Sequence, residues 1–189
     1  GVRLGRPSPY AHVADNDLAV GMLIEALSNS SIWNETAVFI LEDDAQNGAD
    51  HVDAHRSPVY LAGGFVKRGF VDHTPYSTTS VLRTMELILG MGPMSQYDAA
   101  ATPMWRCFDS SPKAFPFKAI IPGVSLNEKS TAINQWQKKS EQFNFAKEDS
   151  NNDIEFNRVL WHGLKGDIPF PGPRRAGFLT VNAKDGDDD

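Results

Sequence analysis

The sequence predicts an α/β sandwich built on a largely parallel sheet. Segments with helical periodicity precede and follow two short, strongly apolar segments, so the order is helix, strand, strand, helix. The connections between these segments are short, and this order favours helices packed on a sheet.

The first helix is expected at 16–27. Four apolar residues recur at i, i+3, i+4 and i+7, which places them on one face of a helix: Val20, Leu23, Ile24 and Leu27. Asp15 directly precedes this segment and is a plausible N-cap, because its carboxylate suits the free amides of the first turn.

Two strands are expected next. Residues 36–41 form an almost continuous apolar run rich in β-branched and aromatic residues, which is typical of a strand covered on both faces. The run 59–62 is shorter, and it ends at Gly63-Gly64.

A second helix is expected at 78–89, with Gly90 as its stop. Residues 92–122 are rich in proline and small residues and are expected to be mostly ordered loop. Residues 128–165 are polar, and their pattern predicts two helices with a break near 150–152.

Composition limits the function classes. The net charge of −6 argues against a nucleic-acid-binding protein, which usually carries a basic stripe. No apolar run approaches the roughly 18 residues that a membrane helix needs. Cys107 is alone, so no disulfide forms within the chain.

The chemistry is concentrated directly after the first predicted strand. Residues 42–56 contain five carboxylates and two imidazoles, in the order Glu42, Asp43, Asp44, Asp50, His51, Asp53 and His55. Active sites of α/β proteins form at the carboxyl ends of strands. Carboxylates so close together repel one another, and a divalent cation relieves this because Asp oxygen and neutral His nitrogen are suitable ligands. The alternative is a solvated acidic loop.

Two known metal-binding patterns do not fit this segment. An EF-hand loop that starts at Asp43 has Ala45 at its third position and Ala54 at its twelfth, where acidic residues are needed. His51 and His55 have the spacing of zincin ligands, but Val52 stands where zincins have glutamate.

Several strings resemble the phosphoesterase branch of the alkaline phosphatase superfamily, which includes bacterial phospholipases C and acid phosphatases. Residues 16–27 match N-D-x-x-x-G-x-L-[IV]-x-x-L, and Trp33 and an apolar strand follow. Asp43-Asp44 stand where the family has Asp-Glu, and residues 50–52 coincide with its D-H-V. Ala45 and residues 46–48 depart from the family's His and Gly pair, and resemble a sub-branch of phosphoesterases. Residues 76–84, 96–104, 160–162 and 171–175 resemble that sub-branch too.

The resemblance implies a three-layer, alkaline-phosphatase-like sandwich with a largely parallel sheet. Residues 1–125 would be the C-terminal portion of its catalytic domain, 126–180 a helical extension packed on it, and 181–189 a disordered acidic tail.

The resemblance also implies a two-metal phosphotransfer site that holds divalent Zn, Mn, Mg or Ca. Asp43 and Asp44 match the carboxylate pair after the central strand, and His55 matches the histidine of the second metal. His51 is the alternative, and one of the two histidines would only orient a ligand. Arg56 could bind a substrate phosphate, or it could pair with Asp53.

No Ser or Thr in the chain matches the family's nucleophile, which lies earlier in family members than the Asn16-Asp17 helix. We therefore expect the chain to be a C-terminal part of an exported enzyme and to be inactive alone. Its substrate is expected to be a small-molecule or lipid phosphoester. The alternatives are a non-catalytic, metal-stabilised binding module and, more distantly, a metalloprotease-like hydrolase.

Overall fold

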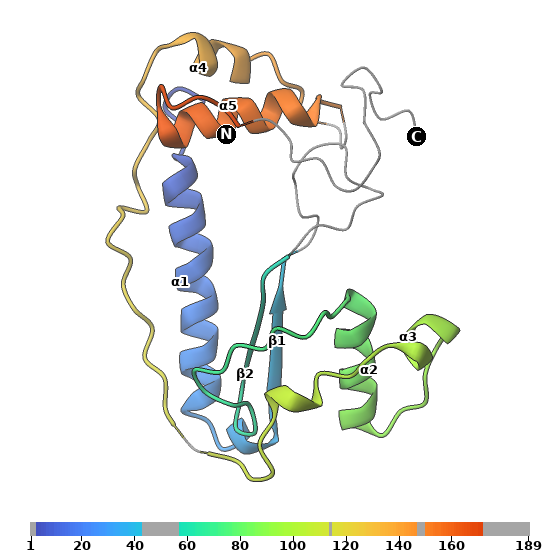
Figure 1. The fold of residues 1–189 in the computed structure, drawn as a ribbon. Helices are drawn as coiled ribbons and strands as arrows, with labels where there is room; N and C mark the ends of the chain where they lie inside the picture. The colour runs from blue at the N-terminus through green and yellow to red at the C-terminus, as the bar shows by residue number, and fades with distance from the viewer. Residues whose placement is uncertain (1–2, 43–56, 114, 147–149, 172–189) are drawn as a thin grey trace. The chain divides into compact units, whose positions relative to one another are not determined.

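The computed structural model describes residues 3–42, 57–113, 115–146 and 150–171. In chain order the elements are α1 (Pro9–Ser28), the 3₁₀ turn η1 (Trp33–Glu35), β1 (Ala37–Leu41), β2 (Val59–Gly63), α2 (Thr78–Leu89), α3 (Gln96–Ala100), the 3₁₀ turn η2 (Trp105–Cys107), α4 (Gln135–Ser140) and α5 (Asp153–Lys165) (Figure 1). In the described ranges, no helix is both long and apolar enough to cross a membrane.

The contacts divide the chain into two compact units. The first comprises the described residues of 1–21, 42–57 and 120–189, and the second comprises 22–41 and 58–119. Helix α1 contributes its first part to one unit and its last turns to the other. The domain division predicted at residue 125 stays a prediction.

Helix α1 begins at Pro9, before the start predicted at residue 16. The Ser8 hydroxyl oxygen accepts a hydrogen bond from the Ala11 amide at 3.1 Å, so Ser8 caps the helix. Proline suits the first helical position because its missing N–H has no partner there. Asp15 lies inside the helix, and the prediction that it is the N-cap was wrong. Ile24 is buried as predicted, whereas Leu23 is 53% exposed.

The two predicted strands form an antiparallel pair, with Ala37 opposite Gly63 and Leu41 opposite Val59 (Figure 1). For these two strands the prediction of a parallel sheet was wrong. The last residue of β1, Leu41, pairs with the first residue of β2, Val59, so the chain reverses its direction between the two strands, whereas a parallel neighbour requires a crossover connection. The strands are also not covered on both faces, because Tyr60 of β2 is 65% exposed.

Close packing explains why β2 ends at two glycines. A Cβ atom on Gly63, whose φ is +154°, would lie 2.3 Å from the carbonyl oxygen of Thr36. On Gly64, a Cβ would lie 2.8 Å from the Cα of Asn34. Any larger residue would therefore push the strand away from the turn η1 that precedes β1.

The core of the second unit joins one face of the hairpin to α2. Phe39 and Leu61 are register partners, so their side chains lie on the same face. Both pack against a buried cluster of Val81, Met104 and Cys107. Helix α2 has the predicted bounds and ends at Gly90, which adopts the left-handed conformation at φ 69°.

The first unit has a smaller aromatic core between α4 and α5. Phe143 and Val159 are its buried members, and Trp136 and Phe156 pack against them. Helix α5 begins after Asn152, whose side chain accepts a hydrogen bond from the Glu155 amide at 3.0 Å. Two helices are present as predicted, but the first is shorter than expected: α4 has 6 residues and ends at Ser140, well before the break predicted at 150–152.

Candidate metal centre

The hairpin holds the two borders of the acidic segment together. Leu41 at the end of β1 pairs with Val59 at the start of β2. One step further along the chain, the Ser57 hydroxyl donates a hydrogen bond to the carbonyl oxygen of Glu42 at 3.0 Å. The residues on the two sides of segment 43–56, the acidic connection between β1 and β2, are therefore held side by side.

The predicted site residues Asp43, Asp44, His51, His55 and Arg56 all lie in this connection, outside the described residues. Their convergence on one or two metal ions stays a prediction. Among the residues that the structure describes, no group of three or more His, Cys, Asp or Glu side chains is placed to hold a metal ion.

The donor set of the connection suits a divalent cation. Carboxylate oxygens are ligands of Mg, Mn and Ca, and Zn binds both carboxylate oxygens and imidazole nitrogens. Glu42, the last described residue before the connection, is exposed. The border of the segment is therefore open to solvent and to solutes.

The described residues contain a second polar cluster, which the sequence analysis did not identify. It is centred on Asp72, in the connection between β2 and α2. One carboxylate oxygen of Asp72 accepts hydrogen bonds from the Thr74 amide at 3.0 Å and the Thr74 hydroxyl at 2.7 Å. The other accepts from the Tyr76 hydroxyl at 3.0 Å and lies 3.9 Å from the Arg106 guanidinium. The thiol of Cys107 lies 3.8 Å from the same oxygen.

These contacts fix the protonation states of the cluster. The Thr74 hydroxyl, followed by the other donors, lowers the pKa of Asp72 to about 2, although burial acts in the opposite direction. Burial and the Asp72 charge raise the pKa of the Cys107 thiol, and burial also raises the pKa of Tyr76. Cys107 therefore stays a thiol at neutral pH, and a thiol is a poor nucleophile. The contacts of Asp72 with Arg106 and Cys107 hold the β2–α2 connection against η2. The signal for it in the sequence was the spacing Asp72-x-Thr74, a common pattern of local turns.

Replacing Asp72 by asparagine is expected to lower the melting temperature at pH 7, because the amide group cannot accept hydrogen bonds on both sides. The difference from the wild type should shrink as the pH falls from about 4 to about 2. A lowered carboxyl pKa stabilises the fold above the unfolded value of 3.8 and loses that effect as the pH falls through the folded value. Thermal denaturation at a series of pH values measures this.

The control is Asp109→Asn, which removes an ion pair with Lys113 at 2.6 Å, in which the Lys113 side chain is 53% exposed. Such surface pairs contribute little. A melting-temperature difference for Asp72→Asn that stays constant down to pH 2 would contradict the role of the carboxylate.

Two further polar residues, His162 and Asp17, lie away from the acidic connection in the sequence. His162 stacks on Trp136, with ring centroids 4.0 Å apart and an interplanar angle of 7°, so it has a packing role. Asp17 is exposed on α1.

Residues 7–92 match the model of the Phosphoesterase family. The match covers less than half of the 189 residues and includes α1, the hairpin with its acidic connection, and α2. No curated protein matches the chain. The family match supports a hydrolase that acts on phosphoesters.

Proposed function

We propose that this chain carries part of the active site of a metal-dependent phosphoester hydrolase. The observation that carries the proposal is the Phosphoesterase match over residues 7–92, which includes the whole acidic connection. The hairpin supports it, because the pairing of Leu41 with Val59 brings the borders of that connection side by side. Ligand residues near the beginning and near the end of the connection would then be close to a common metal site.

Within this proposal, Asp43 and Asp44 hold the metal that activates the nucleophile, and His55 completes the second metal. His51 is the alternative to His55. Divalent metals bound there would supply charge stabilisation at the attacking and leaving oxygens of the phosphoryl transfer. Arg56 would bind a phosphate oxygen, since guanidinium groups form paired hydrogen bonds with phosphate. The nucleophile would be a Ser or Thr outside this sequence, because no Ser or Thr in it matches the family motif.

The proposal includes the finer features that the resemblance implies. The hairpin would be part of a three-layer, alkaline-phosphatase-like sandwich, and the protein would be exported. The substrate would be a small-molecule or lipid phosphoester and not a nucleic acid, in keeping with the net charge of −6.

Adding Mn²⁺ or Zn²⁺ is expected to raise the melting temperature of the chain, because a ligand that binds only the folded state stabilises it by mass action. At a metal concentration 100 times the dissociation constant, the gain is about 2.7 kcal/mol. Phenyl phosphonate, a phosphomonoester analogue that cannot be hydrolysed, should raise it further, but only when metal is present. Differential scanning calorimetry measures both increases in melting temperature.

Two variants serve as controls for this experiment. Asp53→Asn should retain both increases in melting temperature, because Asp53 is not among the proposed ligands. Arg56→Ala should retain the increase caused by the metal and weaken the further increase caused by phenyl phosphonate. An increase with metal but none with phenyl phosphonate would favour the non-catalytic binding module, and the absence of both increases would rule out the proposed site.

A further inference from the structure

Residues 58–119 of the second unit have an asymmetric distribution of charge. They contain six lysines and arginines and four aspartates and glutamates. The carboxylates are largely covered: Glu86 and Asp98 are 2% and 0% exposed, and the side chains of Asp72 and Asp109 are 9% and 23% exposed. Four of the six cations are exposed, namely Arg68, Arg106, Lys113 and Lys118. The surface of these residues is therefore more positive than their sequence indicates.

Two segments of this unit lie side by side and carry several of the cations. The bridge between Val66 and Phe108 joins the segment that follows β2 to the segment that follows η2. The Lys67 amide donates a hydrogen bond to the carbonyl oxygen of Cys107 at 2.9 Å. The Lys67 ammonium donates to the carbonyl oxygen of Arg106 at 2.7 Å. The basic residues of the two segments are therefore held close together.

Aromatic side chains are exposed beside these cations. The Arg68 guanidinium lies over the Phe115 ring, 4.6 Å from its centroid, and the Lys67 ammonium lies 5.1 Å from the centroid of Phe70. Both contacts place a cation at an aromatic face. Trp105, directly before Arg106 in the chain, is 70% exposed. We call these six residues the basic–aromatic surface: Lys67, Arg68, Phe70, Trp105, Arg106 and Phe115.

We propose that the basic–aromatic surface binds an anionic lipid surface, with its rings among the headgroups and its cations beside the lipid phosphates. Exposed apolar side chains next to Lys and Arg are typical of interfacial binding, because burial of apolar area and attraction to anionic lipids add to each other. The indole of Trp105 suits this boundary, since it has an apolar body and a polar N–H. Binding here requires neither the metal ligands nor the nucleophile of the proposed function.

A single-stranded nucleic acid is the competing anionic partner, because its bases stack on exposed rings. Stacking needs free ring faces, whereas Phe70 and Phe115 each have a cation over one face. Val71, which follows Phe70, is 72% exposed and offers apolar area without a ring. An aliphatic side chain gains more from hydrocarbon than from a base, so these features favour the lipid surface.

Vesicle co-sedimentation of the wild-type chain, in buffer with EDTA, tests the proposal. Each basic residue near an anionic surface should strengthen binding roughly fivefold. We therefore expect vesicles of phosphatidylcholine mixed with phosphatidylglycerol to bind at least about 10-fold more tightly than pure phosphatidylcholine vesicles. High salt should weaken this binding by screening. Equal affinity for the two kinds of vesicle, no binding to either, or tighter binding to an oligothymidylate than to the anionic vesicles would overturn the proposal.

Two exposed substitutions locate the binding surface. Arg68→Gln should weaken binding to the anionic vesicles by roughly fivefold, because it removes one charge and little size. Vesicles should shift the tryptophan emission of the wild-type chain to shorter wavelength, because Trp105 enters a less polar environment. Trp105→Ala should weaken vesicle binding and lose most of this shift.

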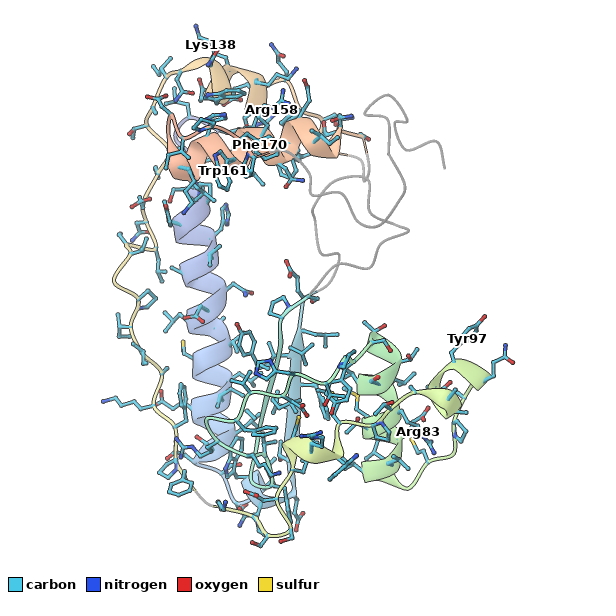
Figure 2. All side chains as sticks on the ribbon, viewed as in Figure 1. Arg83, Tyr97, Lys138, Arg158, Trp161 and Phe170 are labelled. Carbon is cyan, nitrogen blue, oxygen red and sulfur yellow. The ribbon has the colours of Figure 1, made fainter. Side chains whose placement is uncertain are left out.

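The controls belong to the first unit. Lys138→Gln on α4, at a position labelled in Figure 2, removes the same charge from another exposed residue. Ile133→Ala truncates an apolar side chain that is 71% exposed, close to the exposure of Trp105. Both variants should bind the anionic vesicles as the wild type does. Equal losses for Arg68→Gln and Lys138→Gln, or an unchanged emission shift in Trp105→Ala, would show that the basic–aromatic surface is not the binding surface.

Discussion

Replacing Asp43 and Asp44 together by asparagine is expected to weaken divalent-metal binding by at least about 100-fold. Substitution of groups that merely orient metal ligands already lowers affinity by about 10- to 100-fold, so the loss of two charged ligands must do at least as much. Asparagine keeps the size of aspartate and removes only its charge. Competition with a chromophoric chelator for Mn²⁺ or Zn²⁺ measures the dissociation constants.

Single variants of the same segment give this experiment its controls. Asp53→Asn should bind metal nearly as tightly as the wild type, although it removes the same charge from the same connection. His55→Ala should lose more affinity than His51→Ala, because His55 is the predicted ligand. The reverse order would assign the ligand role to His51. Equal losses for Asp53→Asn and for the double variant would indicate a general effect of charge and not a defined site.

Phe143→Ala is expected to lower the free energy of unfolding by about 3–5 kcal/mol, the usual range for removing a buried phenyl ring. Phe143 is 9% exposed and lies in the small core of the first unit, beside Val159. Its ring makes edge contacts with Phe145 and Phe156, with centroids 6.0 Å and 5.7 Å away. The cavity would remain largely open, because α4 has only 6 residues with which to close it. Urea denaturation monitored by tryptophan fluorescence measures the change.

Phe145→Ala is the matched control for this substitution. Phe145 belongs to the same group of rings, at 5.5 Å from Phe156, but its side chain is 49% exposed. Removal of a half-exposed ring takes less apolar area out of the core, so the loss should be clearly smaller. Similar losses for the two variants would mean that Phe143 does not form the core of this unit.

The sequence by itself determined the elements whose signals are local. Helix α2 has the predicted bounds because its apolar periodicity and the left-handed position of Gly90 depend on neighbouring residues alone. Both strands were likewise predicted from short apolar runs. The acidic connection was recognised as a candidate metal site from its composition, and the family match covers it. The start of α1 is also indicated by neighbouring residues, Ser8-Pro9. The helix was predicted to start later because the apolar residues that indicated it lie further along the chain.

Only the tertiary structure decided features that depend on distant partners. The direction of β2 relative to β1 follows from the pairing of Leu41 with Val59, across a connection whose path no local pattern specifies. The Asp72 cluster needs Arg106 and Cys107, which are far away in the sequence. The burial of Glu86 could not be predicted because, in the sequence, it is an ordinary polar position of an amphipathic helix. It becomes buried only once the chain is folded and α3 contacts α2.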